Sequence, residues 1–151
     1  MRAAVLDLDA VLGDTRPLWR AWLVDTARRV RVPELESLPE DRVAAASELD
    51  ARVGNWRALL ERFAEDHAPV YLRPDAPTSA ALRRLHGDGV RLAAFTDAPE
   101  PLARIAAAHL GAARRLEALE AGEGALERAL TRLGDDAVVV RSREELVAAA
   151  A

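Results

Sequence analysis

Residues 5–15 read VLDLDAVLGDT, so a short apolar run ends in two aspartates, Asp7 and Asp9, just before a turn at Gly13. The mostly apolar residues 2–8 are typical of a strand buried on both faces, as in a parallel sheet. Burial disfavours carboxylates at the end of such a strand unless their charge is compensated. The two acids therefore either form a functional pair or cap the turns that follow.

Three further segments, residues 90–95, 114–119 and 137–140, are predicted strands separated by helical segments. Strands that alternate with helices indicate an α/β fold with a parallel sheet and right-handed crossovers. Such sheets bind ligands beyond the carboxyl ends of their strands. Candidate site residues therefore follow the strands: Asp7 to Ala10, Thr96 with Asp97, and Arg141 with Ser142.

Residues 14–72 contain helical patterns and no strand. Thr15 is the expected N-cap of a first helix, with Pro17 in its first turn. The segment Ser37–Glu40 has the spacing of a capping box and predicts the start of a second helix. A third helix is expected after Gly54. We predict that this segment is a small helical subdomain inserted into a core formed by residues 1–13 and 73–151.

The composition narrows the class of protein further. The 151 residues include no cysteine and no lysine, and the formal net charge is −4. This indicates one domain with no thiol-ligated metal and without the basic surplus of a nucleic-acid-binding protein. The chain has no run of about 20 apolar residues that could span a membrane. We expect a soluble, cytoplasmic protein that binds neither nucleic acid nor membrane.

The segment 5–15 resembles the first motif of phosphatases of the haloacid dehalogenase (HAD) superfamily, D-x-D-G-[VT]-L after an apolar strand. The resemblance implies that Asp7 is the nucleophile, which becomes phosphorylated, and that Asp9 is the general acid/base. Asp7 and the backbone carbonyl of Asp9 would bind Mg²⁺. Ala10 departs from the motif, because glycine is usual at its position. The implied fold is a Rossmann-like core whose helical cap, residues 14–72, closes over the site.

Residues 92–97, LAAFTD, resemble the second motif of the same superfamily. The resemblance implies that the hydroxyl of Thr96 holds the phosphoryl group, with Asp97 beside it at the N-terminus of a helix, where anions bind readily. The alternative is that Thr96 and Asp97 only cap this helix, since Asp97 and Glu100 have capping-box spacing.

The third and fourth motifs depart from the family pattern. The third normally supplies a lysine, whereas the corresponding residues 120–123 read EAGE; Arg114 or Arg115 could reach inward in its place. In the fourth motif, Arg141, Ser142 and Leu146 stand where glycine and two aspartates are usual. Glu144 or Glu145 could substitute after a local shift, but Ser142 with Glu145 also has capping-box spacing.

These departures affect the expected cofactor, because Mg²⁺ would lose its main additional carboxylate. We predict that the guanidinium of Arg141 pairs with Asp7 or Asp9 and takes over charge neutralisation from the metal. His67, His86 and His109 lie far apart in the sequence and do not have metal-ligand spacing.

Two functions remain open. The acid pair favours a Mg²⁺-dependent phosphatase that acts on a small phosphorylated metabolite through an aspartyl-phosphate. The rewritten third and fourth motifs favour a catalytically inactive HAD-like domain that serves as a binding or interaction module. Tryptophans of the helical segment, if exposed, would in addition favour a homodimer.

Overall fold

The computed structural model describes all 151 residues and contains one parallel sheet of four strands in the order β3-β2-β1-β4. The strands are β1 (Ala3–Asp7), β2 (Arg91–Thr96), β3 (Ala118–Ala121) and β4 (Val138–Val140). The register places Asp7 opposite Phe95 and Thr96 opposite Ala121, so the carboxyl ends of the strands meet at one edge. The predicted parallel α/β sheet is confirmed.

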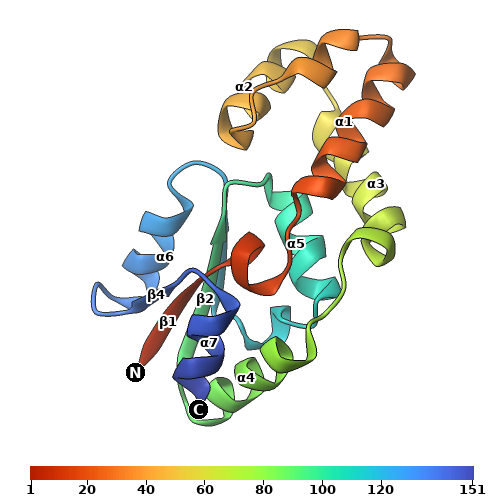
Figure 1. The fold of residues 1–151 in the computed structure, drawn as a ribbon. Helices are drawn as coiled ribbons and strands as arrows, with labels where there is room; N and C mark the ends of the chain where they lie inside the picture. The colour runs from red at the N-terminus through yellow and green to blue at the C-terminus, as the bar shows by residue number, and fades with distance from the viewer.

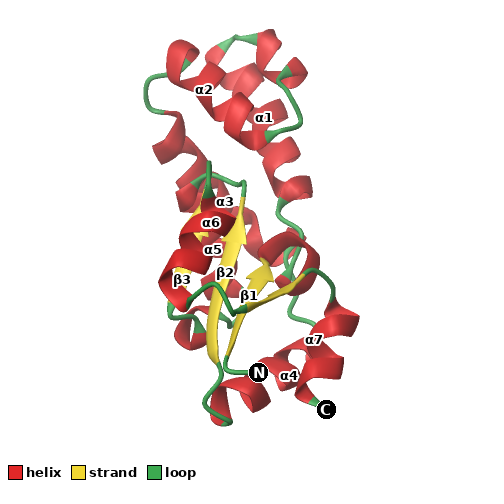
Figure 2. Ribbon diagram, turned by 90° about the vertical axis from the view of Figure 1, so that its left-hand side faces the viewer, coloured by secondary structure: helices red, strands yellow, loops and turns green.

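Helices cover both faces of the sheet (Figures 1 and 2). The helix α6 (Ala125–Leu133) packs on one face, where it contacts Ala3 and Val5 of β1. The other face meets α4 (Ala76–Gly87), α5 (Glu100–His109) and α7 (Arg143–Ala150), in one core with Ala4 and Leu6. Successive residues of a strand point to opposite faces, which explains why Ala3 to Leu6 of β1 are all apolar.

Three helices follow the first strand; the first two lie beyond the carboxyl end of the sheet, and the third runs back towards the core (Figure 1). They are α1 (Arg16–Val30), α2 (Arg42–Arg52) and α3 (Trp56–Tyr71), and α3 packs on α5 of the core. Trp19, Trp22 and Trp56 pack together with ring centroids 5.3–6.4 Å apart. All three are buried, so the exposed tryptophans that would have favoured a homodimer are not present.

The second helix begins later than its sequence pattern indicated. Residues Pro33–Ser37 form a 3₁₀ turn, and α2 starts at Arg42 with Asp41 as N-cap, whose side chain accepts a hydrogen bond from the Val43 N–H at 3.1 Å. The capping box predicted at Ser37 is therefore wrong. Pro39 explains the shift, because the residue before a proline is held out of the helical region, and Leu38 is extended.

The third strand also begins later than predicted. Arg114 and Arg115 lie in a 3₁₀ turn (Ala113–Arg115) before β3, at the amino end of the sheet. The Arg115 guanidinium donates to the Gly111 carbonyl at 3.2 Å. Neither arginine can reach the carboxyl edge, so the substitution for the third-motif lysine by Arg114 or Arg115 is wrong.

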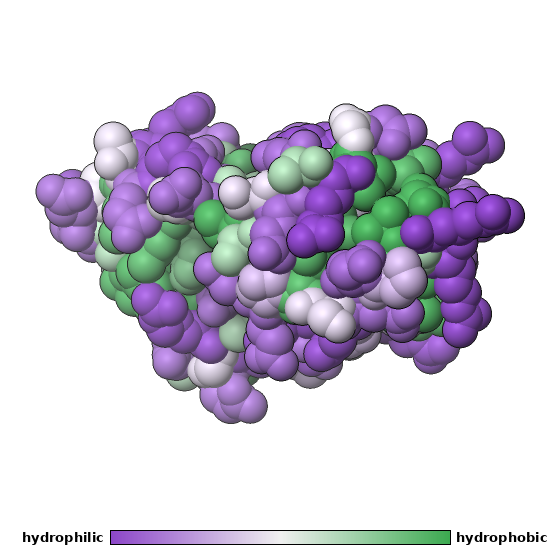
Figure 3. All heavy atoms as spheres, turned by 90° about the horizontal axis from the view of Figure 1, so that it is seen from above, coloured by the Kyte–Doolittle hydropathy of each residue, from purple (hydrophilic) through white to green (hydrophobic).

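Hydrophilic residues dominate the face of the molecule that carries α1 to α3, with apolar residues visible between them in patches (Figure 3). No helix of the chain combines the length and the apolar character that crossing a bilayer requires.

Candidate active site

The loop after β1 is a single turn of π-helix, Leu8–Leu12, and its shape fixes the first aspartate. Asp7 caps this turn, and its Oδ1 accepts a hydrogen bond from the Ala10 N–H at 3.3 Å. Burial raises the pKa of Asp7, and the charge of Asp9 adds to the rise, against the Ala10 N–H and Arg141. No cation lies within ion-pair distance of the Asp7 carboxylate.

The second aspartate, by contrast, has both carboxylate oxygens occupied. Asp9 Oδ1 accepts from the backbone N–H of Thr15 at 2.9 Å and from the Thr15 hydroxyl at 2.5 Å. Asp9 Oδ2 accepts from the Thr96 hydroxyl at 2.7 Å and from the Arg42 guanidinium at 2.9 Å. Thr15 stands at the predicted N-cap position of α1, but its side chain does not cap the helix because it is used here.

Arg42, the first residue of α2, lies at the centre of these contacts and is only 1% exposed. Besides Asp9, its guanidinium reaches Asp97 Oδ1 through Nε at 3.0 Å and Nη2 at 2.8 Å. Its Nη1 donates to the Thr15 hydroxyl at 2.6 Å, and its backbone N–H donates to Asp97 Oδ2 at 3.3 Å. A single buried guanidinium thus joins α2 to the ends of β1 and β2.

The network decides the protonation of Asp9. Burial alone would raise the pKa of this carboxyl, but Arg42 and the hydrogen bonds from Thr15 and Thr96 outweigh burial and lower it. Asp9 is therefore ionised at neutral pH and held in a fixed orientation.

The structure brings together Asp7, Asp9, Thr96 and Asp97, as the strand topology predicted. The interpretation of Asp97 and Glu100 as a capping box is wrong: α5 is capped at Pro99 without a side-chain bond, because the Asp97 carboxylate turns to Arg42. Thr96 has a helix-terminal contact as well, since its Oγ1 accepts from the Ala98 N–H at 3.1 Å.

The predicted ion pair of Arg141 with Asp7 or Asp9 does not form. The Arg141 guanidinium lies over the Phe95 ring, 5.7 Å from its centroid, and the cation that pairs with Asp9 is Arg42. The charge of Arg141 acts on Asp7 from a distance and opposes the rise in the pKa of the Asp7 carboxyl. The reason lies in the backbone: the Arg141 N–H binds Glu145 Oε2 at 3.1 Å, which ties this residue to the start of α7.

Sequence reasoning missed Arg42. One signal was available, because a cation in the first turn of a helix opposes the helix dipole and is unfavourable there without another partner. That signal required the correct start of α2, which the Ser37 capping box obscured.

At the third-motif position, the nearby cation is Arg128 of α6. It pairs with Glu120 at 2.8 Å and donates to the backbone carbonyls of Ala121 and Glu123. At the fourth-motif position, Ser142 accepts from the Glu145 N–H at 3.1 Å and caps α7, as the capping-box interpretation predicted. The Arg143 guanidinium binds the carbonyls of Val11 and Leu12, at 3.1 and 3.4 Å, and so holds the π-helical turn.

These donors do not fit a magnesium ion. Mg²⁺ requires near-octahedral oxygen ligation. The expected ligands are the Asp7 carboxylate and the Asp9 backbone carbonyl; the occupied Asp9 carboxylate adds no further ligand, and Ser142 is used as a cap. No three acidic or histidine side chains are arranged to hold a metal ion anywhere in the chain. Of the two aspartates of the first motif, only Asp7 has a carboxylate without an ion pair.

A cavity of about 410 Å³ opens over these residues. Its wall carries more acids than bases: the carboxylates are Asp7, Asp9, Glu40, Asp41 and Asp97, and the guanidiniums are Arg16 and Arg42. An anionic ligand would therefore meet an acidic wall unless a cation accompanied it.

No family model matches the sequence, and no curated protein matches it either. Solved structures do match the fold. CbbY from Rhodobacter sphaeroides, a HAD-superfamily phosphatase solved in complex with phosphate, superposes with a TM-score of 0.69 at 16% sequence identity. The match covers 92% of this chain and 76% of that chain. At this identity the likeness concerns the fold, and it confirms the prediction from the sequence: the chain has the HAD-like α/β fold, with its helical insertion after the first strand.

Proposed function

We propose that this protein is a catalytically inactive HAD-like domain that serves as a binding or interaction module. The observation that carries the proposal is the burial of the Arg42 guanidinium between Asp9 and Asp97. In this proposal residues 14–72 are the cap, and Arg42 holds the cap against the core. Asp9 of the first motif is then kept for structure rather than for phosphoryl transfer.

The state of Asp9 supports this proposal. A general acid must carry a proton near the working pH and must be free to pass it to the leaving group. The lowered pKa of Asp9 keeps the proton off, and four hydrogen bonds hold the carboxylate in place. Asp9 could act only after its ion pair with Arg42 had been broken.

The distribution of cations supports the same proposal. Phosphoryl transfer needs positive charge beside the transferring group. The chain has no lysine, and Arg128 is committed to Glu120 and to backbone carbonyls. Arg42 itself is neutralised by two carboxylates. Arg16 of the cavity wall pairs with Asp14. The guanidinium near Asp7 that has no ion pair is that of Arg141, which lies over Phe95.

One observation favours the second candidate, a Mg²⁺-dependent phosphatase of a small phosphorylated metabolite. The Asp7 carboxylate is half-buried, unpaired, and faces the cavity, as a nucleophile would. In a form of the protein in which the ion pairs of Arg42 with Asp9 and Asp97 were broken, Asp7 is the residue that would attack phosphorus.

Hydrolysis of an aryl phosphate with and without Mg²⁺, in wild type and in Asp7→Asn, separates the two candidates. We expect the two proteins to show the same background rate, with no dependence on Mg²⁺. Because a strict substrate preference could hide activity, thermal unfolding with millimolar Mg²⁺ gives a readout that needs no substrate, since a bound ion stabilises the folded state. Magnesium-dependent turnover, or a magnesium-dependent rise in Tm, that Asp7→Asn abolishes would overturn the proposal.

A further inference from the structure

A pocket of about 290 Å³ lies at the amino end of the sheet. Its walls come from the end of α4, the start of β2 and the 3₁₀ turn Ala113–Arg115, and α4 contacts this turn directly. In Figure 1 the end of α4 and the start of β2 lie at the end of the molecule away from α1 and α2. No residue of this pocket lines the candidate active site, which lies at the carboxyl edge of the sheet.

Basic side chains outnumber acidic ones around this amino-end pocket: the bases are His86, Arg91, Arg114 and Arg115, and the acid is Glu117. Arg91 neutralises that acid, since its Nε and Nη2 donate to the two Glu117 carboxylate oxygens at 2.9 and 2.5 Å. Neither Arg114 nor Arg115 lies within ion-pair distance of a carboxylate. Two positive charges of the pocket are therefore left without a partner.

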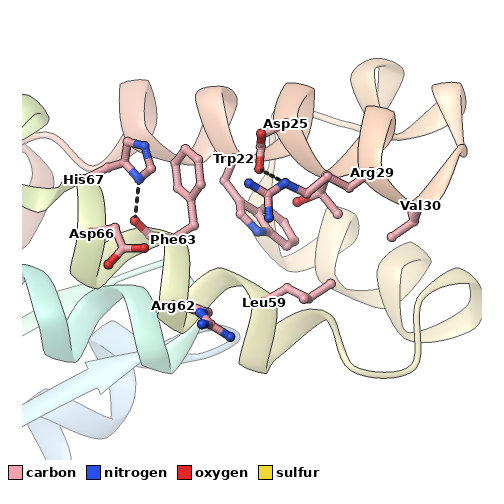
Figure 4. A pocket seen from close by; sticks show the side chains of 10 residues that line it. Trp22, Asp25, Arg29, Val30, Leu59, Arg62, Phe63, Asp66 and His67 are labelled. Atoms are coloured by element: carbon pink, nitrogen blue, oxygen red, sulfur yellow. Dashed lines mark hydrogen bonds and ion pairs between the residues drawn. The ribbon is translucent and has the colours of Figure 1, made fainter.

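Other cavities of the protein differ from this pocket in charge. The cavity between α1 and α3 balances the carboxylates of Asp25 and Asp66 against the guanidiniums of Arg29 and Arg62 (Figure 4). The cavity over the candidate active site carries more carboxylates than guanidiniums. On a chain whose formal net charge is −4, the amino-end pocket is therefore a local region of positive potential, and such a region attracts anions.

The backbone holds Arg115 in position for such a ligand. Its side chain is half-buried, and its Nη1 donates to the Gly111 carbonyl, just after α5, at 3.2 Å. A guanidinium has five N–H donors in a planar fork, so this one bond leaves donors free. Arg114 is exposed at the mouth of the same pocket. The two arginines can therefore offer several N–H groups to one anion.

Charge and lining together indicate the class of anion. Guanidiniums bind phosphate oxygens through paired hydrogen bonds. A phosphate monoester carries nearly two negative charges at neutral pH, which matches the two unpaired cations. The rest of the wall is apolar, because Val90 and Leu92 are buried and Leu116 is half-buried. These side chains provide a surface on which the organic part of such an ester can pack.

We propose that the amino-end pocket binds a small organic phosphate monoester, with its phosphate group between Arg114 and Arg115. The volume is close to the lower limit of small-molecule sites, about 300 Å³, and so fits a small ester rather than a polymer. The proposal does not rest on the inactivity of the candidate active site, because neither Asp7 nor Arg42 lines this pocket.

The test uses the intact protein and two probes of the same shape, phenylphosphonate and benzenesulfonate. Neither can be hydrolysed, and at about pH 8 they differ by one negative charge. Isothermal titration calorimetry at low salt measures the two affinities, since salt screens exposed charges. We expect phenylphosphonate to bind saturably and roughly tenfold more tightly than benzenesulfonate, the effect of one additional charged hydrogen bond.

Two variants and one control locate the binding. Arg114→Gln, at an exposed position where the fold should tolerate it, and Arg115→Gln should each weaken phenylphosphonate by about tenfold. Arg73→Gln removes the same charge from an exposed arginine outside the pocket and should change the affinity by less than about twofold. No saturable binding in wild type, equal affinity for the two probes, or equal losses in Arg114→Gln and Arg73→Gln would overturn the proposal.

Discussion

The inner and outer strands of the sheet end in polar side chains that are used in different ways. At the ends of β1 and β2, Asp9, Thr96 and Asp97 bind partners far away in the sequence, and Arg42 joins them from α2. Beside the ends of β3 and β4, Arg128 and Ser142 form hydrogen bonds with residues no more than eight positions away in the sequence.

The arginines of the two edges also differ in how deeply their side chains are buried. The side chain of Arg42 is 1% exposed and that of Arg128 is 47% exposed. Buried ion pairs are costly to break from one side, because the remaining charge is left without a partner, whereas exposed pairs contribute little. The inner network around Arg42 should therefore hold the fold together, whereas Arg128 and Ser142 should finish only the helices beside them.

The largest expected effect comes from removing the shared cation. Arg42→Met leaves Asp9 with only its hydroxyl and amide donors, in a buried position. We expect a loss of roughly 3–5 kcal/mol in the free energy of unfolding, measured by urea denaturation. Arg128→Met is the matched control from the outer edge and should lose no more than about 1 kcal/mol. Equal losses in the two variants would show that burial of the inner network has no energetic weight.

Substitution of the two aspartates of the first motif should change the free energy of unfolding in opposite directions. The pKa of Asp9 is lowered in the folded state, so its contribution to stability is present above the unfolded value, near pH 4, and is lost as pH falls through the folded pKa. The pKa of Asp7 is raised, so ionised Asp7 destabilises the fold at neutral pH, and the effect disappears in acid.

At pH 7, Asp9→Asn should therefore lose roughly 2–3 kcal/mol through the broken pair with Arg42. Asp7→Asn should gain stability, by less than about 1 kcal/mol, because the amide can still accept from the Ala10 N–H. Below about pH 4 both differences should shrink as the wild-type carboxyls take up protons. Denaturation curves of both variants across this range check the signs. A loss of stability in Asp7→Asn at neutral pH would indicate that a cation pairs with Asp7 after all.

The sequence predicted the features that repeat along the chain. The apolar runs of β1 and β2 and the alternation of helix and strand were enough for the parallel sheet, and the sheet in turn placed Asp7, Asp9, Thr96 and Asp97 at one edge. The N-cap of α7 at Ser142 was also predictable, because a capping box is a local pattern.

The contacts of the site were not predictable in the same way. Asp97 has the spacing of a helix cap but binds Arg42, 55 residues away. Arg141 has the right place in the sheet for an ion pair, yet its guanidinium lies over Phe95. For Asp97 the choice of partner depended on where α2 begins, and a single proline, Pro39, moved that start. For Arg141 it depended on the bond of its backbone N–H with Glu145 at the start of α7. A local pattern says which bonds are available, and the tertiary fold selects among them.

A smaller effect than that of Arg42→Met is expected at the most local bond of the outer edge. Ser142→Ala removes the acceptor for the Glu145 N–H at the first turn of α7, and loss of an N-cap costs about 1 kcal/mol. Hydrogen exchange should locate the change in α7 alone, because Leu146, buried against α4, still anchors the helix. Glu145→Gln serves as the control, since the amide oxygen can still accept from the Arg141 N–H. If Ser142→Ala instead destabilised the protein as much as Arg42→Met, and exchange rose along β1 and β2 as well, then the outer edge would be coupled to the Asp9 network, and the division between the two edges would fail.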